Sequence, residues 1–92
     1  MITDKYLIHE VPNPAGGVSR IYRFKSGMGL SLINAPIAHF YPFAWEAAVT
    51  RGVKDDGTSE GLDYSTPLTE DVITLKSDEE ANAFIEKAAK TI

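Results

Sequence analysis

Two histidines, His9 and His39, are the first residues to consider for chemistry, because imidazole is both a base near neutral pH and a common metal ligand. They fall on separate predicted elements, and neither belongs to a His-x-x-x-His or HExxH pattern. The chain has no cysteine, which excludes a thiolate zinc site, a disulfide framework and a cysteine nucleophile. No Gly-x-Ser-x-Gly elbow supports a serine nucleophile. We therefore expect no catalytic residue, no metal site and no cofactor, and we rank a small enzyme as the weakest of three functional hypotheses.

Two short motifs resemble ligand-binding loops without completing them. Gly27-Met28-Gly29 is a GxG, but a dinucleotide loop needs a third glycine and a following helix. Residues 55–60 begin with Asp55-Asp56-Gly57, yet they lack the alternating acidic positions and the late glutamate of a calcium loop. We interpret both motifs as turns between strands.

Basic and aromatic side chains alternate between residues 20 and 25, an arrangement that can contact nucleic acid. Strand alternation puts Tyr22 and Phe24 on one face beside Arg20, and Arg23 and Lys25 on the other. The aromatic face is more simply a core face, and the net charge of −4 opposes binding to phosphate. Nucleic acid is therefore not an expected partner.

The charge is unevenly distributed along the chain. Residues 1–54 carry six basic and three acidic side chains, whereas residues 55–92 carry three basic and ten acidic ones. A sheet of one sign beside a helix of the other explains this difference, and a partner-binding surface is the alternative.

The segment from His39 to Phe43 is unusually rich in aromatic side chains for a loop. Its first three residues lie between Pro36 and Pro42. Loop aromatics often anchor protein interfaces, because they cover a large area at low entropic cost. The alternative is that they fold back and close the core. We predict His39, Phe40 and Tyr41 as partner-binding residues, with the acidic C-terminal half steering the encounter.

These residues must be positioned by one small domain spanning residues 1–92, because the chain is short and 43% hydrophobic. No apolar run approaches 18 residues, so we expect no membrane span, and the first residues lack a signal-peptide pattern. Apolar alternation and turn residues predict strands at 5–11, 18–25, 30–33 and 43–50, with a short candidate at 62–64 and an ambiguous stretch at 66–75.

A C-terminal helix is the clearest predicted element. Ser77 and Glu80 form a capping box, in which the Ser77 hydroxyl accepts from Glu80 N–H and the carboxylate reaches back to Ser77 N–H. An apolar stripe then recurs at helical spacing and should pack on the sheet face that carries Trp45. The expected fold is therefore α+β: an antiparallel meander of about four strands with one helix packed on it. A domain of this size also leaves a homodimer open. The stripe consists of Ala81, Phe84, Ile85, Ala88 and Ala89.

Residues 22–33, YRFKSGMGLSLI, resemble a YxFxNGYGASVV segment found in small phage and prophage proteins. In those proteins a Trp-Glu-x-Ala-Val strand follows, then a DTPITDDVIGYLTEEE stretch that enters a terminal helix. The counterparts here are residues 45–49 and 63–75, so the resemblance covers roughly residues 22–92. The chain departs from the pattern at Ser26, at Met28 and in the aromatic loop 34–42.

This resemblance implies a phage origin and a fold, and it carries over no catalytic residue. We therefore expect an accessory protein that binds a host protein in the host cytoplasm, for example as an anti-CRISPR-like inhibitor of a defence system. A self-associating structural or morphogenesis protein of the virion is the alternative from a different class.

Overall fold

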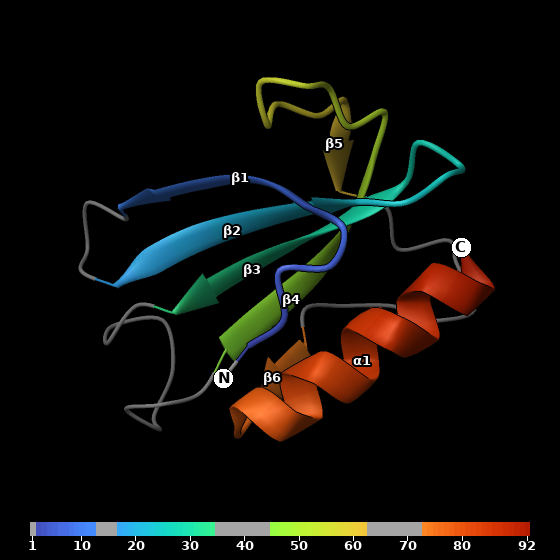
Figure 1. Ribbon diagram of the computed structural model, residues 1–92. Helices are drawn as coiled ribbons and strands as arrows, with labels where there is room; N and C mark the ends of the chain where they lie inside the picture. Colours follow the sequence, from blue (N-terminus) through green and yellow to red (C-terminus); the bar gives the residue numbers. More distant parts are fainter. Residues whose placement is uncertain (1, 13–16, 35–44, 63–72) are drawn as a thin grey trace.

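The computed structural model describes residues 2–12, 17–34, 45–62 and 73–92 (Figure 1). These ranges contain six strands and one helix. They are β1 (Leu7–Pro12), β2 (Val18–Arg23), β3 (Gly29–Asn34), β4 (Trp45–Arg51), β5 (Gly61–Leu62), β6 (Ile73–Leu75) and α1 (Asp78–Thr91). The predicted α+β fold, an antiparallel sheet with one C-terminal helix, is confirmed.

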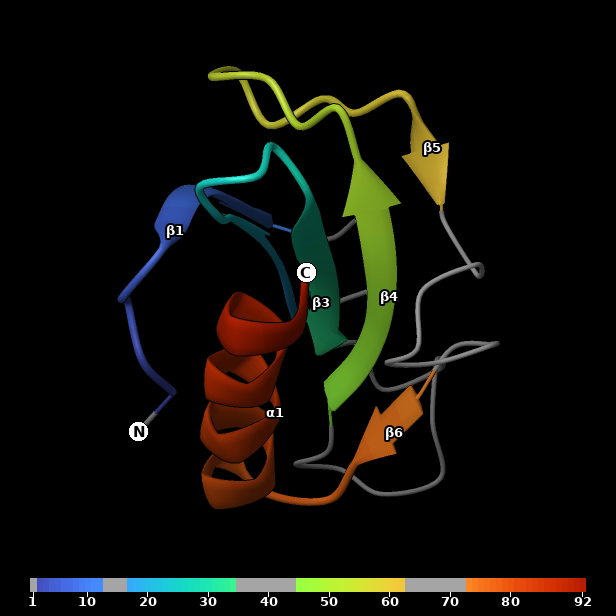
Figure 2. The same ribbon diagram turned by 90° about the vertical axis from the view of Figure 1, so that its right-hand side faces the viewer.

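The sheet is an antiparallel meander in the order β1-β2-β3-β4, as the sequence predicts. Two short strands extend it, because β5 and β6 both pair with β4 at its opposite ends (Figure 2). β5 lies at the start of the short candidate strand predicted at 62–64. β6 lies in the stretch that sequence left ambiguous, so the prediction of about four strands was too low.

The first strand begins later than predicted, because Tyr6 has a left-handed backbone conformation, with φ of 72°. A turn closed by Leu7 N–H donating to the Asp4 carbonyl (2.9 Å) precedes β1. Residues 2–6 therefore leave the sheet and run toward α1 instead of extending β1 (Figure 1).

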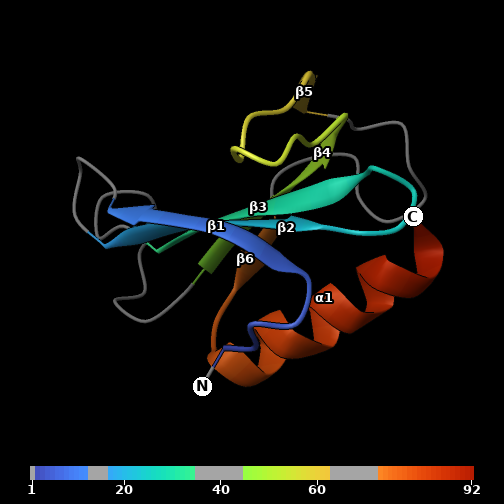
Figure 3. The same ribbon diagram turned by 45° about the horizontal axis from the view of Figure 1, so that its top comes forward.

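One face of the sheet forms the core beneath α1. The register aligns Tyr22 with Leu30 and Leu30 with Val49, and all three side chains are fully buried. Figure 3 shows α1 on this side of the sheet and the loop between β4 and β5 on the other. Tyr22 of β2 and Phe24, which follows that strand, are buried in the same cluster as Trp45, which confirms that the aromatic face predicted for residues 20–25 is a core face.

The capping of α1 differs in one detail from the prediction. Ser77 is the N-cap, and its hydroxyl accepts from Glu80 N–H (3.1 Å) as expected. The Glu80 carboxylate, however, accepts from Lys76 N–H (2.6 Å), one residue earlier than the predicted Ser77 N–H. A carboxylate on a flexible side chain can satisfy either amide at the end of a helix.

The apolar stripe of α1 faces the core, with Ala81, Ile85 and Ala88 fully buried. Phe84 is only half-buried and packs at the margin of the core cluster. Ile85 is therefore the large side chain at the centre of the helix–sheet contact. The helical spacing of the stripe placed Phe84 and Ile85 on the same face and did not distinguish which of them is central.

The glycines of the motif Gly27-Met28-Gly29 have different structural roles. Gly27 has φ of 87° and turns the chain between β2 and β3, as predicted. Gly29 already belongs to β3, and a Cβ there would clash with the Tyr22 carbonyl oxygen. Only Gly27 is therefore a turn glycine, whereas Gly29 is needed for a close approach between backbones.

Candidate functional site

The predicted partner-binding residues His39, Phe40 and Tyr41 lie outside the described residues. Their assignment to an interface stays a prediction.

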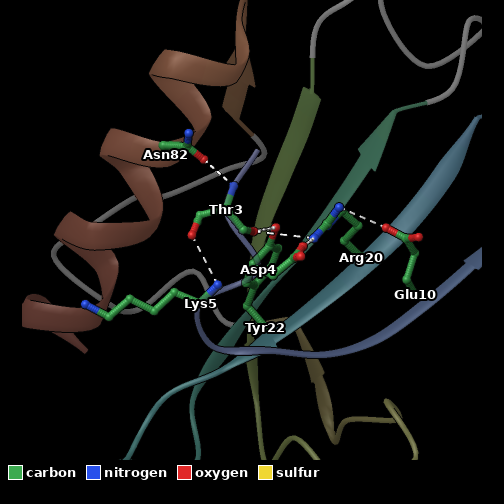
Figure 4. Close-up of polar contacts among 7 residues, drawn as sticks. All are labelled: Thr3, Asp4, Lys5, Glu10, Arg20, Tyr22 and Asn82. Atoms are coloured by element: carbon green, nitrogen blue, oxygen red, sulfur yellow. Dashed lines mark hydrogen bonds and ion pairs between the residues drawn. The ribbon is translucent and has the colours of Figure 1, made fainter. Parts of the chain in front are cut away.

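The most extensive polar cluster in the described chain surrounds Arg20 and is shown in Figure 4. We call it the Arg20 cluster. The Arg20 side chain is only 10% exposed, and it reaches across the core face of β2 toward residues 2–6 and β1. Its Nη1 lies 2.9 Å from Glu10 Oε2, and its Nη2 pairs with the Asp4 carboxylate. The cluster comprises Thr3, Asp4, Lys5, Glu10, Arg20, Tyr22 and Asn82.

The two carboxylates explain how a guanidinium can lie this deep, since an unpaired buried charge is strongly destabilising. Burial acts to lower the pKa of Arg20, and the hydrogen bond to Asp4 and the charge of Glu10 act to raise it; the net direction is upward. Arg20 therefore stays positively charged. Both carboxylates remain accessible to water, with 81% of the Asp4 side chain and 44% of the Glu10 side chain exposed.

Tyr22 supplies the second anchor of the cluster from the same strand. Its hydroxyl donates to the Thr3 carbonyl oxygen at 2.9 Å, and the Arg20 guanidinium carbon lies 5.7 Å from the centre of its ring. Burial raises the pKa of the Tyr22 hydroxyl, although the charge of Arg20 opposes the shift. The phenol is therefore protonated at neutral pH and acts as a hydrogen-bond donor, not as a base.

The cluster also connects the sheet to the helix. Thr3 N–H donates to Asn82 Oδ1 on α1 at 2.7 Å, so the two sides of one residue contact α1 and β2. Lys5 Nζ lies 3.6 Å from Glu86 Oε1, one turn further along α1. Residues 2–6 are thus fastened to both layers.

The chemistry of this cluster is that of an ion pair and a set of hydrogen bonds. It has no histidine, and within the described residues its Tyr22 hydroxyl donates to a backbone carbonyl. Across the described ranges, no group of three or more His, Cys, Asp or Glu residues could hold a metal ion. What the arrangement can do is hold residues 2–6 against two layers at once.

Sequence reasoning identified Arg20 but assigned it no partners. The sequence did contain one signal for a partner. Arg20 shares a strand face with Tyr22, this face is predicted to be a core face, and a buried arginine requires a carboxylate. Glu10 lies opposite Arg20 in the antiparallel β1–β2 pairing. Thr3 and Asn82 carry no such signal, because they are 79 positions apart.

The loop between β4 and β5 forms a second polar region, on the opposite side of the sheet. Arg23 Nη1 lies 2.6 Å from Asp55 Oδ1, and Gly57 packs closely on the His9 ring. Asp56 Oδ1 accepts from Thr58 N–H (3.0 Å) and from its hydroxyl (2.7 Å), and these bonds lower the pKa of Asp56. Residues 55–60 thus form a turn, as interpreted from sequence.

Comparisons with protein-family models, curated proteins and solved structures find no match to this chain. The one helix within the described ranges, α1, is too short and too polar to cross a membrane.

Proposed function

We propose that this chain is a small phage- or prophage-encoded accessory protein that acts by binding another protein. The proposed partner is a host protein in the host cytoplasm, and inhibition of a defence system, as by an anti-CRISPR, is one concrete form. The resemblance of residues 22–92 to phage and prophage proteins supports the origin.

The observation that carries the binding role is that Arg20 and Arg23, two arginines of β2, are both paired with carboxylates of the same chain. Arg20, the buried charged side chain, is matched by Asp4 and Glu10 of the same chain. Arg23, which could have contacted phosphate, is matched by Asp55. Arginines paired within the chain in this way support the role of a stable scaffold that presents a surface to a partner.

Within this proposal, His39, Phe40 and Tyr41 are the anchors that contact the partner. The test is a pull-down from host lysate with wild type and with Phe40→Ala/Tyr41→Ala, each first shown to be folded. The recovered protein is then purified, and its affinity for both forms is measured. Lys87→Ala, a change at an exposed position of α1, is the matched control.

We expect the double variant to lose at least about 30-fold in affinity, since a hot-spot side chain contributes about 2 kcal/mol or more. Lys87→Ala should bind as wild type does. Equal recovery by wild type and the double variant would reject the loop assignment. Recovery of no partner, together with a dimer that the double variant breaks in sedimentation, would favour the self-associating virion protein instead.

A further inference from the structure

Residues 2–6, which we call the strap, contact both the sheet and α1 through hydrogen bonds, ion pairs and the packing of Ile2 and Tyr6. We propose that the strap detaches as a unit while the sheet and α1 stay folded, and that ionic strength sets how often it does. This conformational step is independent of the proposed function.

Thr3 makes most of the hydrogen bonds that hold the strap to the rest of the domain, and the Tyr6 carbonyl accepts one more, from Arg23 N–H (3.0 Å). Thr3 N–H donates to Asn82, and the Thr3 carbonyl accepts from Tyr22 and, at 3.4 Å, from Arg20 Nη2. The hydrogen bond of Lys5 N–H to Thr3 Oγ1 (3.1 Å) lies within the strap. Because one residue bonds to both layers, its departure releases α1 and β2 together.

The charged ties of the strap are open to water. Asp4 is 81% exposed although it pairs with the buried Arg20, and the Lys5–Glu86 pair lies on the surface. Salt screens pairs between exposed groups much more than buried ones, so it acts fully on the Lys5–Glu86 pair and, through the exposed Asp4 carboxylate, in part on the Asp4–Arg20 pair. Detachment also leaves no buried charge without a partner, because Arg20 is then accessible to water and remains paired with Glu10.

Backbone strain favours opening, and apolar packing opposes it. Tyr6, at the junction of the strap and β1, has φ of 72°, a conformation that is unfavourable for a side chain with a Cβ. Ile2 and Tyr6 pack against the core cluster, and the Tyr6 ring lies edge-on to Phe24 with centroids 5.1 Å apart. The closed form is therefore the dominant one, with opening as a low-energy excursion.

Opening breaks the bond from Arg23 N–H to the Tyr6 carbonyl but leaves β1 paired with β2 from Leu7 onward, so it changes one surface of the domain. It exposes Arg20 and Tyr22 to solvent, so that a buried arginine paired with carboxylates becomes an accessible cation beside an aromatic ring.

Native-state hydrogen exchange measured by NMR tests this step, because particular amides report on it. Thr3 N–H, Leu7 N–H and Arg23 N–H donate to Asn82, Asp4 and the Tyr6 carbonyl respectively, so each loses its acceptor or its position when the strap leaves. We expect these three amides to share one protection factor, lower than that of Ala81 N–H in α1, and with weaker dependence on urea.

Two variants separate strap opening from global unfolding. Tyr22→Phe removes a tie and should accelerate the strap amides about fivefold to tenfold, the effect of one lost hydrogen bond. Val49→Ala removes methyl groups from the core on β4 and weakens the closed and strap-open forms equally. It should accelerate the α1 amides at least about tenfold and leave the strap amides unchanged. If Val49→Ala does not fold, Ile85→Val provides the same comparison with a smaller cavity.

Equal acceleration of strap and α1 amides by the core variant would overturn the proposal, because the strap would then open only when the whole domain unfolds. The ionic part has its own test. Raising NaCl from about 0.02 M to 1 M, across which the Debye length falls severalfold, should accelerate the strap amides in wild type, and much less in Asp4→Asn/Glu86→Gln, which lacks both ion pairs. Strap amides that are insensitive to salt would refute the role of the ion pairs.

Discussion

Gly29 is the position at which the structure makes the sharpest stability prediction. A methyl group added there would clash with the Tyr22 carbonyl oxygen and would lie 3.0 Å from Val53 Cγ2. The carbonyl belongs to β2 and cannot rotate away, so the strands must separate at this end of the sheet. Two hydrogen bonds lie in the path of that movement: Phe24 N–H to the Met28 carbonyl (2.9 Å) and Val53 N–H to the Gly27 carbonyl (3.0 Å).

Loss of both bonds at about 1 kcal/mol each, with some added strain, predicts that Gly29→Ala costs about 2–4 kcal/mol. That is a large share of the roughly 5–14 kcal/mol expected for a domain of 92 residues. The assay is urea unfolding followed by the fluorescence of Trp45, the single tryptophan, which is buried. With a urea dependence of about 1 kcal/mol per molar, the midpoint should fall by about 2 M or more.

Gly27→Ala is the matched control, since Gly27 lies two residues away with open space around it. Its φ of 87° makes alanine cost only about 1–2 kcal/mol. Gly29→Ala should therefore be the more damaging change. A midpoint for Gly29→Ala equal to or above that of Gly27→Ala would refute the close backbone approach.

Four further predictions test the core, the cluster and the absence of a cofactor. The buried hydroxyl of Thr50 has no partner among the described residues, so Thr50→Val should stabilise by about 1 kcal/mol in urea unfolding, whereas the exposed Thr74→Val should change little. Ile85→Ala should cost about 2–5 kcal/mol and lower the melting temperature by 10 °C or more, against almost no effect of Lys87→Ala. Burial raises the pKa of Tyr22 in the folded protein. The contribution of its hydroxyl to the free energy of unfolding is therefore complete below the unfolded pKa near 10 and is lost as pH rises through the folded pKa. Alkaline unfolding should accordingly be less steep in Tyr22→Phe than in wild type. Dialysis against a chelator should leave the melting curve unchanged, and a fall that one divalent ion reverses would contradict the expectation of no metal.

The parts of the fold that sequence predicted are those specified by neighbouring residues. Ser77 and Glu80 mark the start of α1 through a cap that spans three positions. The β2–β3 hairpin follows from alternating side chains around Gly27. Both depend on local periodicity and local hydrogen bonds, which a single sequence contains in full.

The parts that sequence missed depend on contacts between distant segments. β6 has only three residues and is defined by its pairing with β4. The sequence predicted a strand at the position of β4 but did not indicate which segments pair with it. The strand predicted from residue 5 starts at Leu7, because Thr3 and Asp4 bond to α1 and β2 and so draw the chain away from the sheet. The Arg20 cluster was missed for the same reason: its members come from residues 2–6, from three elements and from both ends of the chain.

The small residues of α1 explain why these polar contacts matter for the position of the helix. Ala81 and Ala88 allow α1 to lie close to the sheet, but each buries little apolar area, so Ile85 supplies most of the fully buried side-chain surface of the stripe. Directional ties compensate near the start of the helix. Trp45 Nε1 on β4 donates to Asp78 Oδ1 at 2.8 Å, and Asn82 accepts from Thr3 one turn later. A hydrogen bond fixes direction, which apolar packing of small side chains does not. The first half of α1 is therefore oriented by its polar partners, and the second half follows because the helix is continuous.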